Sequence, residues 1–351
     1  MQGDLNILEI GEHGLFKQGR PDQTEFILAA SDFEQWARPR FPEPAPRSVG
    51  ELRRAVRAGA FDLIVLHAPA YSPLSCVRLR QYASSWRRGL RGTAARASLP
   101  FMIDPGPTPI VVLDMEDQPS IYRHNLRLLD RCTAYFKREL PTDHARLFLR
   151  LVAPALPTET ERGDVAMQAR IAKLHPISIG LPADRVPDFP ADMAKEVDVF
   201  FAGQSTGNST VRARGLDELA VLARHGVRID IAAGRLSWPD YAARCARAHL
   251  VWSPEGLGWD CFRHYEAALC GSVPVISQPT IHRYRPLIEG IHCFHYGVEP
   301  GGLVRAVRAA LRNPDRLRRM AVAGRRHVLR HHIHSRLCDY VVATSLRGTP
   351  A

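Results

Sequence analysis

The stretch Val251–Ile276, VWSPEGLGWDCFRHYEAALCGSVPVI, decides the fold class of this chain. It opens with the apolar run of a buried strand and passes through a glycine-containing loop into a helical segment at residues 262–270. A Gly-Ser-Val-Pro turn then leads into a second apolar run. Strand, helix and strand in this order predict a parallel βαβ unit.

The same alternation runs through the rest of the chain. In the second half we expect strands at residues 197–202, 227–232, 250–253 and 273–276, and helices at 211–225, 239–248, 262–270 and 303–312. In the first half we expect strands at residues 5–10, 61–66 and 110–113, and helices at 49–60, 75–90 and 120–131. Ser237 is expected to cap the helix that follows it. The pattern predicts an α/β protein of two Rossmann-like, doubly wound domains.

Domain boundaries follow from a proline-rich connection at residues 176–190, which holds four prolines and a glycine. We expect an N-terminal, acceptor-side domain over residues 1–178, a linker over 179–196 and a second domain over 197–330. A helix in residues 331–351 is expected to pack back on the first domain. Two doubly wound domains place a ligand cleft between them, at the carboxyl ends of their strands.

Composition excludes several classes of protein. Of the 351 residues, 45% are apolar and 24% charged, which is typical of a globular chain and not of a disordered or fibrous one. No apolar run is long enough for a membrane span, and the opening residues lack the pattern of a signal peptide, so we expect a cytoplasmic protein. The seven cysteines contain no CxxC pair, which argues against a zinc ribbon or a disulfide scaffold.

The net charge of +11 raises the question of nucleic-acid binding. Only four of the 47 basic residues are lysines, and the arginines are spread over many amphipathic segments and form no single block. We therefore expect no nucleic-acid partner. A site for an anionic small molecule fits the arginine-rich composition.

Two residues of the opening stretch have side chains suited to a nucleotide. Arg263 and Glu266 are three residues apart and share one face near the start of a helix, where free backbone N–H groups attract anions. Arg263 suits a diphosphate, and Glu266 can accept hydrogen bonds from ribose hydroxyls. The alternative is an Arg–Glu surface pair beside the core-facing residues 267–269.

The spacing of this stretch resembles a known family. Its pattern, Pro254-x-Gly256, Arg263-x-x-Glu266-Ala267 and Gly271-x-x-Pro274-Val275, is similar to the nucleotide-binding half of exostosin-like glycosyltransferases, and related patterns occur in the wider GT-B group. The segment Phe200-Phe201-Ala202-Gly203, followed by Arg212, resembles a strand and arginine of the same family. The resemblance covers residues 195–330. It implies a GT-B fold, two Rossmann-like domains facing a cleft, and a nucleoside diphosphate sugar held by Gly203, Arg212, Glu255, Gly256, Arg263 and Glu266.

The resemblance also bears on the chemistry. Many retaining GT-B enzymes carry two glutamates eight residues apart, whereas Gly258 stands eight residues before Glu266 and Glu255 stands eleven before it. This favours inverting transfer. Because GT-B enzymes usually neutralise the diphosphate with arginines and helix ends, we expect neither a metal nor another cofactor.

An inverting reaction needs a general base for the acceptor hydroxyl, and His, Glu and Asp can serve. The loop after the first strand offers Glu12 and His13 between two glycines, and the cluster Asp114-Met-Glu116-Asp117 follows another strand. We expect the base to be His13, Glu12 or Asp117. A solvated loop remains the alternative for Glu12 and His13, and an acceptor-binding or metal site the alternative for the acidic cluster. His67, which also follows a strand, is interpreted as a polar loop residue.

The sequence thus predicts a glycosyltransferase, transferring a hexose or pentose to a saccharide, a lipid-linked acceptor or a small molecule. Two alternatives remain open. One is a sugar-nucleotide epimerase or phosphorylase on the same fold, and the other is a non-catalytic module that binds nucleotide sugars.

Overall fold

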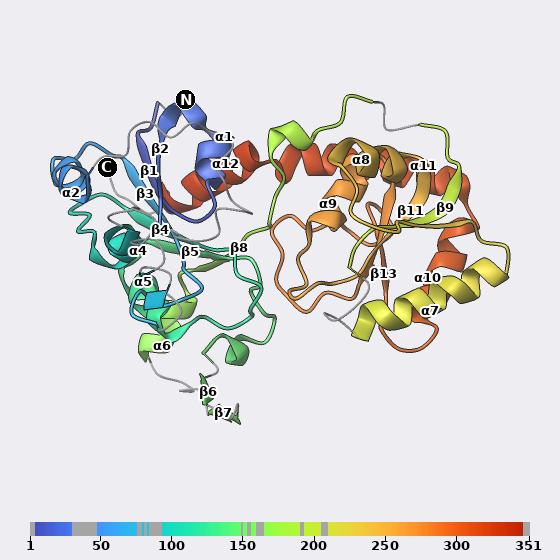
Figure 1. The fold of residues 1–351 in the computed structure, drawn as a ribbon, viewed down its shortest axis with the longest axis horizontal. Coiled ribbons are helices and arrows are strands. Elements are labelled where there is room, and N and C mark those ends of the chain that lie inside the picture. The colour runs from blue at the N-terminus through green and yellow to red at the C-terminus, as the bar shows by residue number, and fades with distance from the viewer. Residues whose placement is uncertain are drawn as a thin grey trace. The chain divides into compact units, whose positions relative to one another are not determined.

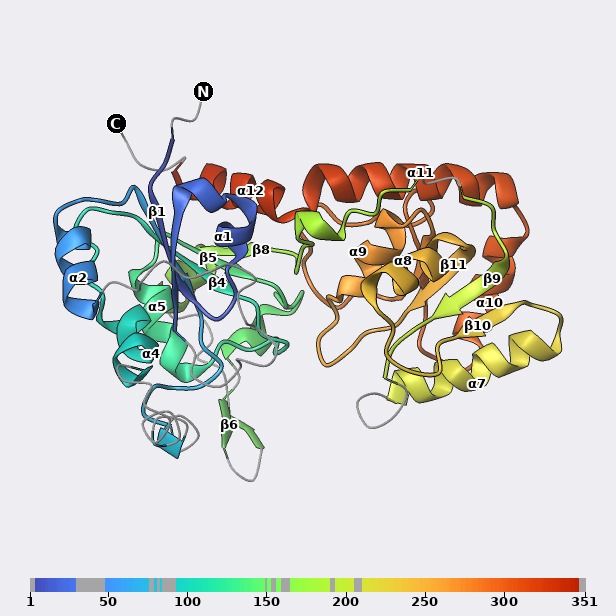
Figure 2. The same cartoon turned by 45° about the horizontal axis from the view of Figure 1, so that its top comes forward.

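The computed structural model describes residues 4–29, 48–75, 79–80, 83, 93–148, 150–152, 156–158, 165–189, 193–204 and 210–346. The chain divides into two compact units (Figures 1 and 2). Unit 1 comprises residues 1–177 together with 338–351, and unit 2 comprises residues 178–337. Residues 179–196, which the sequence suggests as a linker, are thus grouped with unit 2, and the last residues of the chain with unit 1.

Unit 1 is built on a six-stranded parallel sheet in the order β2-β1-β3-β4-β5-β8. Its strands are β1 (Ile7–Gly11), β2 (Thr24–Leu28), β3 (Leu63–His67), β4 (Ile110–Asp114), β5 (Ala134–Lys137) and β8 (Leu174–Pro176). Its helices are α1 (Leu15–Gly19), α2 (Val49–Arg57), α4 (Thr93–Met102), α5 (Leu126–Arg131), α6 (Val165–Ile171) and the end of α12 (His334–Leu346). A short antiparallel pair, β6 (Arg150–Val152) and β7 (Leu156–Thr158), lies apart from the sheet.

Both faces of this sheet are buried: every residue of β1, β3, β4 and β5 is buried, and alternate residues of a strand point to opposite sides. On one face Leu8, Ile64 and Val112 pack with apolar residues of α2, α4 and α5. On the other face α1 and the end of α12 lie together: the Cys338 thiol contacts the carbonyl of Leu15 at 3.7 Å.

Unit 2 has a five-stranded parallel sheet in the order β10-β9-β11-β12-β13. Its strands are β9 (Val197–Phe201), β10 (Ile229–Ile231), β11 (Ala248–Ser253), β12 (Val273–Ser277) and β13 (Phe294–Tyr296). Its helices are α7 (Thr210–Arg224), α8 (Trp238–Ala246), α9 (Phe262–Leu269), α10 (Gly302–Leu311), α11 (Pro314–His331) and the start of α12.

The helices of unit 2 cover both sides of its sheet. Phe201 and Trp252 pack with residues of α7 and α10, whereas Phe200 and Val251 pack with α8 and α9. The long helix α11 lies along α9, as the two views agree (Figures 1 and 2). Ser237 caps α8 by accepting a hydrogen bond from the Asp240 N–H, which confirms the predicted helix start.

Several elements differ from the sequence prediction. Short strands β2, β5, β8 and β13 were not predicted, because runs of three to five residues carry little periodic signal. The helix expected over residues 120–131 is α-helical only from Leu126, after a 3-10 turn at residues 123–125. Most of the helix expected at residues 75–90 lies outside the described residues. Within the described part of the chain, no helix is long and apolar enough to cross a membrane.

Candidate active site

Each sheet reverses the direction of its strand order at one point. In unit 1 this point lies between β1 and β3, and in unit 2 between β9 and β11. Ligands of open α/β sheets bind at the carboxyl ends of the strands beside such a switch point. The residues predicted from the sequence follow these strands: Glu12 and His13 come after β1, Gly203 after β9, and Glu255 to Arg263 after β11.

Arg263 joins the two loops at the switch point of unit 2. The residue is 8% exposed, and its Nε donates to the Ala202 carbonyl at 3.0 Å, just after β9. Its Nη1 donates to the Pro254 carbonyl at 3.3 Å, just after β11. The guanidinium also lies 5.3 Å from the centre of the Phe201 ring. The surface Arg–Glu pair considered from the sequence does not describe Arg263, because this side chain is buried on backbone carbonyls.

Arg212, on α7, repeats this arrangement from the other side. It is also 8% exposed, and it donates to the Glu255 carbonyl at 3.0 Å and to the Gln204 carbonyl at 3.3 Å. Desolvation and the nearby Arg263 charge lower the pKa of Arg212. Among the described residues neither guanidinium has an ion-pair partner. Two buried positive charges therefore lie close to each other at the switch point of unit 2.

The predicted glycines leave room for these guanidiniums. A Cβ on Gly203 would lie 2.6 Å from Nη2 of Arg263, and one on Gly256 would lie 3.2 Å from Nη2 of Arg212. Both distances are too short for an unstrained contact. The two glycines therefore allow close approach of the arginines to the loop backbone.

Glu266 lies on α9 and is partly buried, with a side chain 14% exposed. Its carboxylate is 3.6 Å from Nη1 of Arg185, and burial raises the pKa of Glu266 despite the nearby positive charges of Arg185 and Arg263. Glu255 is partly exposed, and burial also raises its pKa while Arg212 opposes this shift. The structure therefore brings Gly203, Arg212, Glu255, Gly256 and Arg263 to one edge of the unit 2 sheet, and the first turn and a half of α9 carries Glu266.

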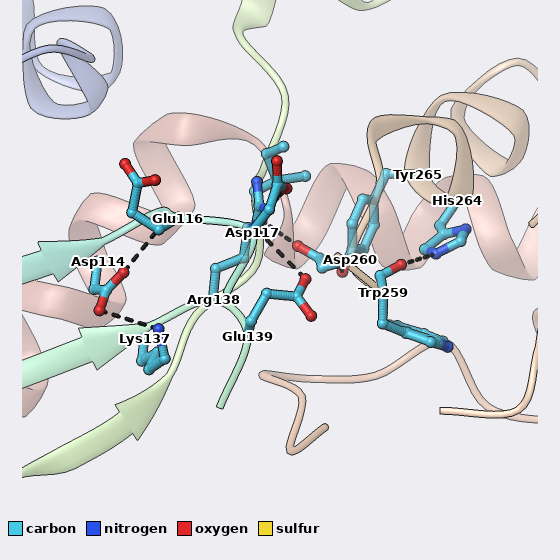
Figure 3. Close-up of polar contacts among 11 residues, drawn as sticks. Asp114, Glu116, Asp117, Lys137, Arg138, Glu139, Trp259, Asp260, His264 and Tyr265 are labelled. Carbon is cyan, nitrogen blue, oxygen red and sulfur yellow. Dashed lines mark hydrogen bonds and ion pairs between the residues drawn. The ribbon is translucent and has the colours of Figure 1, made fainter. Parts of the chain in front are cut away.

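His264 fixes the loop after β11, and sequence reasoning missed it. The residue is buried, and its Nε2 lies 2.8 Å from the Trp259 carbonyl (Figure 3). Its Nδ1 lies 2.7 Å from the Ser253 hydroxyl. Because a carbonyl only accepts, Nε2 carries the proton and Nδ1 accepts from the hydroxyl. Burial lowers the pKa of His264 to about 3, so the ring is neutral. Trp259 is itself buried and donates to the Ser277 carbonyl at 3.1 Å, so it is a core residue.

At the switch point of unit 1 a buried pair supports the loop that holds Glu12 and His13. Glu9, in the middle of β1, lies 2.8 Å from Nε2 of His67 at the end of β3. Its two carboxylate oxygens also accept the backbone N–H groups of Phe16 and Lys17, at 3.0 and 2.8 Å. The interpretation of His67 as a polar loop residue is therefore wrong, because this side chain is buried and ends a central strand. The signal was a glutamate within an apolar strand, which needs a buried partner.

The predicted bases Glu12 and His13 lie in the loop directly after β1. His13 has an exposed surface, and its ring lies 6.0 Å from the ring of His67. Desolvation by the atoms packed around the ring, followed by the His67 imidazole, lowers the pKa of His13 to about 4. At neutral pH His13 is therefore an uncharged and weak base. Glu12 is partly buried beside it.

The acidic cluster after β4 contains side chains in different states (Figure 3). Asp114 is buried and accepts from Lys137 Nζ at 3.0 Å, from the Tyr135 hydroxyl at 2.7 Å and from the Glu116 N–H at 3.3 Å. Asp117 forms an ion pair with Arg138. Both aspartates are thus held by positive charges of β5 or of the loop that follows it.

Glu116 differs from its neighbours. No hydrogen bond or ion pair of its carboxylate occurs within the described part of the chain, and Figure 3 shows its side chain turned away from Lys137. Desolvation, followed by the negative charges of Asp114 and Glu12, raises the pKa of Glu116 to about 7. A carboxylate in this state is suited to accept a proton near neutral pH.

Comparison with known proteins shows the fold of the chain and a family to which part of it is similar. The family model described as "Glycosyl transferase-like" matches residues 216–342. These residues comprise most of unit 2 and the part of α12 up to residue 342. Over the whole length the two parallel-sheet units match solved GT-B glycosyltransferases. The chain therefore has the GT-B fold, as the sequence predicts, and residues 216–342 are similar to the glycosyl transferase-like family. The exostosin-like resemblance stays a prediction.

Three solved structures illustrate the match. HepE from Anabaena, in complex with UDP, is 14% identical, with 97% of this chain and 99% of that chain covered and a TM-score of 0.55. A glycosyltransferase from Rickettsia africae is 9% identical, with 99% and 100% covered and a TM-score of 0.56. An alpha-glucosyltransferase in complex with UDP and a 13-mer DNA is 10% identical, with 98% and 100% covered and a TM-score of 0.54. No curated protein sequence matches this chain.

Proposed function

We propose that this protein transfers a sugar from a nucleoside diphosphate sugar to a hydroxyl group of an acceptor. The observation that carries the proposal is the pair of buried guanidiniums, Arg212 and Arg263, at the switch point of unit 2. Two neighbouring cations that have no carboxylate ion-pair partner among the described residues, and that are held on backbone carbonyls, are suited to a bound diphosphate.

The donor is bound by unit 2. Arg212 and Arg263 hold the diphosphate, beside Gly203, Glu255 and Gly256, and the Glu266 carboxylate accepts hydrogen bonds from the ribose hydroxyls. Because HepE and the alpha-glucosyltransferase were both solved with UDP, a UDP-hexose is the first donor to test. The sugar is a hexose or a pentose.

Unit 1 supplies the base. As the acceptor oxygen bonds to C1 of the sugar, the bond from C1 to the diphosphate oxygen breaks, and the acceptor proton passes to a carboxylate or imidazole. Of the sequence candidates, Asp117 is paired with Arg138, and His13 has a pKa of about 4. Glu116, with its raised pKa and no partner in the described residues, fits the role best, with Glu12 beside it.

We further propose that the reaction inverts the anomeric centre and uses no metal ion or other cofactor. The charge of the leaving diphosphate is stabilised by the two guanidiniums. In the acidic cluster, Asp114 is the carboxylate best placed to be a metal ligand. Both of its oxygens, however, already accept hydrogen bonds from the protein.

The acceptor is a saccharide, a lipid-linked saccharide or a small metabolite. The arginines of the chain are dispersed, so no nucleic acid is proposed as acceptor, although one structure of similar fold was solved with DNA. We also propose a cytoplasmic location.

A ligand-binding screen tests the proposal directly. Nucleoside diphosphates and their sugars should raise the thermal midpoint of unfolding, because a ligand that binds only the folded state stabilises it by ~2.7 kcal/mol at 100 times its Kd. Donors that stabilise are then incubated with candidate acceptors and the products analysed. Absence of stabilisation by every nucleoside diphosphate overturns the proposal. A product formed from the donor alone indicates an epimerase, one that requires orthophosphate indicates a phosphorylase, and binding without turnover indicates a binding module.

A further inference from the structure

Three side chains that the proposed transfer does not use come together at the edge of the unit 2 sheet. They are Glu289 and Cys293, from the loop before β13, and His295 within β13. One ligand atom from each lies within 4.8 Å of the other two. The Cys293 Sγ is 3.7 Å from the His295 Nε2, and the Glu289 Oε2 is 3.4 Å from the His295 Nδ1.

The backbone holds these residues in place. Glu289 and Cys293 form an isolated parallel bridge, and the Gly290 N–H donates to the Cys293 carbonyl at 2.9 Å. Gly290 has a φ of +74°, a conformation that a residue with a Cβ adopts only with strain. The Glu289 carboxylate also accepts the backbone N–H of His295. The three side chains are therefore positioned by the turn itself, before any ligand is present.

Their chemistry is that of a mixed transition-metal site. Zinc takes cysteine sulfur at about 2.3 Å, and histidine nitrogen and carboxylate oxygen at about 2.0 Å, so tetrahedral ligand atoms lie about 3.5 Å apart. The separation of Sγ and Nε2 already has this size. Cys293 is fully buried and the His295 side chain is 9% exposed, whereas the Glu289 side chain is 51% exposed. The Glu289 carboxylate faces Nδ1 of His295, so it must turn toward Nε2 to become the third ligand, and its exposed side chain is the one that is free to do so.

We propose that Glu289, Cys293 and His295 bind one zinc-class divalent ion, with Sγ, Nε2 and a carboxylate oxygen as ligands. Binding displaces the thiol proton of Cys293 to solvent and leaves the oxidation state of the metal unchanged. The loop before β13 lies toward the amino ends of the parallel strands, whereas the donor loops follow their carboxyl ends. The ion is therefore structural: it ties the loop to β13, an edge strand of the sheet.

Metal binding by the full-length chain tests this site. After removal of metals by a chelator, equilibrium dialysis with Zn²⁺ should give one ion per chain, and Co²⁺ should give a thiolate-to-metal charge-transfer absorption. Cys293→Ser should abolish the absorption, and His295→Gln should weaken Zn²⁺ binding at least tenfold. Glu289→Gln, at an exposed side chain, should fold normally and weaken binding by a smaller factor.

Two controls separate this site from adventitious binding. Cys261 is the only cysteine in the described part of the chain that is not buried, and Cys261→Ser should keep the Co²⁺ absorption. His331 belongs to a neighbouring group of histidines, with its ring 4.9 Å from that of His327, and His331→Gln should keep full Zn²⁺ binding. The proposal is overturned if the wild-type chain binds no Zn²⁺. It is equally overturned if Glu289→Gln leaves the affinity unchanged, or if binding is lost in either control.

Discussion

The carboxylate of Glu9 lies 2.8 Å from Nε2 of His67, and both side chains are buried in unit 1. The same carboxylate accepts two free N–H groups of the first turn of α1, those of Phe16 and Lys17, so one side chain connects β1, β3 and α1. His67 in turn packs against Gly11, where a Cβ would lie 2.3 Å from the His67 Cβ. The buried Glu9–His67 pair thus fixes the two ends of the loop that carries Glu12 and His13.

Loss of this pair should destabilise the fold. Glu9→Ala removes one partner of a buried pair and leaves two backbone N–H groups without an acceptor, so we expect a loss of ~3–5 kcal/mol in the free energy of unfolding. Urea unfolding measures it. The control is Glu299→Ala, whose ion pair with Arg305 is exposed and should contribute less than ~1 kcal/mol. Equal losses in the two variants contradict the assignment.

Donor affinity should depend on the two guanidiniums. Arg263→Gln and Arg212→Gln should each weaken binding of the nucleoside diphosphate by ~1.5–3 kcal/mol, the range for hydrogen bonds to charged groups. Calorimetry measures this. Arg319→Gln, at an exposed residue of α11, is the control and should bind normally. Nucleosides without phosphates should bind the variants and the wild type alike, and a loss that is equal for both ligands argues against phosphate contacts.

Glu266 should report on the ribose. Glu266→Ala should weaken binding of a nucleoside diphosphate by ~1.5–3 kcal/mol because the ribose hydroxyls lose a charged acceptor. The same substitution should have little effect on the 2′,3′-dideoxy analogue, which has no hydroxyls to donate. The affinities of the wild type and of Glu266→Ala, each for the nucleoside diphosphate and for its dideoxy analogue, form a double-mutant cycle. This cycle measures the coupling between the Glu266 carboxylate and the ribose hydroxyls. Zero coupling shows that the Glu266 carboxylate does not contact the ribose.

The glycines beside the arginines should not tolerate a methyl group equally. Gly203→Ala places a Cβ 2.6 Å from Nη2 of Arg263, which two hydrogen bonds prevent from moving away. We expect a loss of donor affinity of about tenfold, or ~1.4 kcal/mol. Gly256→Ala, with a 3.2 Å contact to Arg212, serves as the milder comparison and should have a smaller effect. The reverse order contradicts this account of the loops.

Glu116 should control the pH dependence of transfer. Its pKa is raised from 4.5 to about 7, so its basic form predominates only above about pH 7. The value of kcat/KM should therefore rise with pH through this value and then level off. Glu116→Gln should lower kcat by ~10²–10⁴-fold with donor affinity nearly intact. Glu12→Gln, His13→Gln and Asp117→Asn are the comparisons. A full loss in one of these, with normal turnover in Glu116→Gln, moves the base to that residue.

The same pKa has a consequence for stability. The folded state binds the Glu116 proton more tightly than the unfolded state, so the stability contributed below pH 4.5 is lost as the pH rises through about 7. Glu116→Gln should therefore be more stable than the wild type at pH 8, by ~1–2 kcal/mol after allowance for partial exposure, and no more stable at pH 4. Thermal unfolding at the two pH values measures the difference.

Transfer should not require Mg²⁺ or Mn²⁺, because arginine side chains neutralise the leaving diphosphate. Initial rates are measured in a chelator that binds both ions, and again after Mg²⁺ or Mn²⁺ has been added back in excess. Full loss of activity that Mg²⁺ or Mn²⁺ restores contradicts the prediction and makes Asp114 and Glu116 the first ligands to examine. Zn²⁺ is kept out of this comparison because Glu289, Cys293 and His295 are a separate proposed site.

The sequence could predict that the proposed donor-side residues lie near one another, because most of them are close together along the chain. Gly256, Arg263 and Glu266 lie in one strand-loop-helix unit, and the spacing of Arg263 and Glu266 already places these two on one face of the helix. What the spacing did not give is the state of these side chains. Arg263 reaches the Ala202 carbonyl 61 residues away, and only the parallel pairing of β9 and β11 brings that carbonyl near.

The sequence and the tertiary structure therefore determined different features of this protein. The sequence by itself determined the α/β class and the division into two parallel-sheet units, because the period of apolar residues and the positions of glycine and proline are local properties. Only the tertiary structure decided which polar residues are paired: Glu9 with His67, Asp114 with Lys137 and Asp117 with Arg138. It also left Glu116 with no partner in the described residues and a raised pKa. Burial and charge depend on what the fold places nearby, and the strands that bring these residues together are separated by tens of residues along the chain.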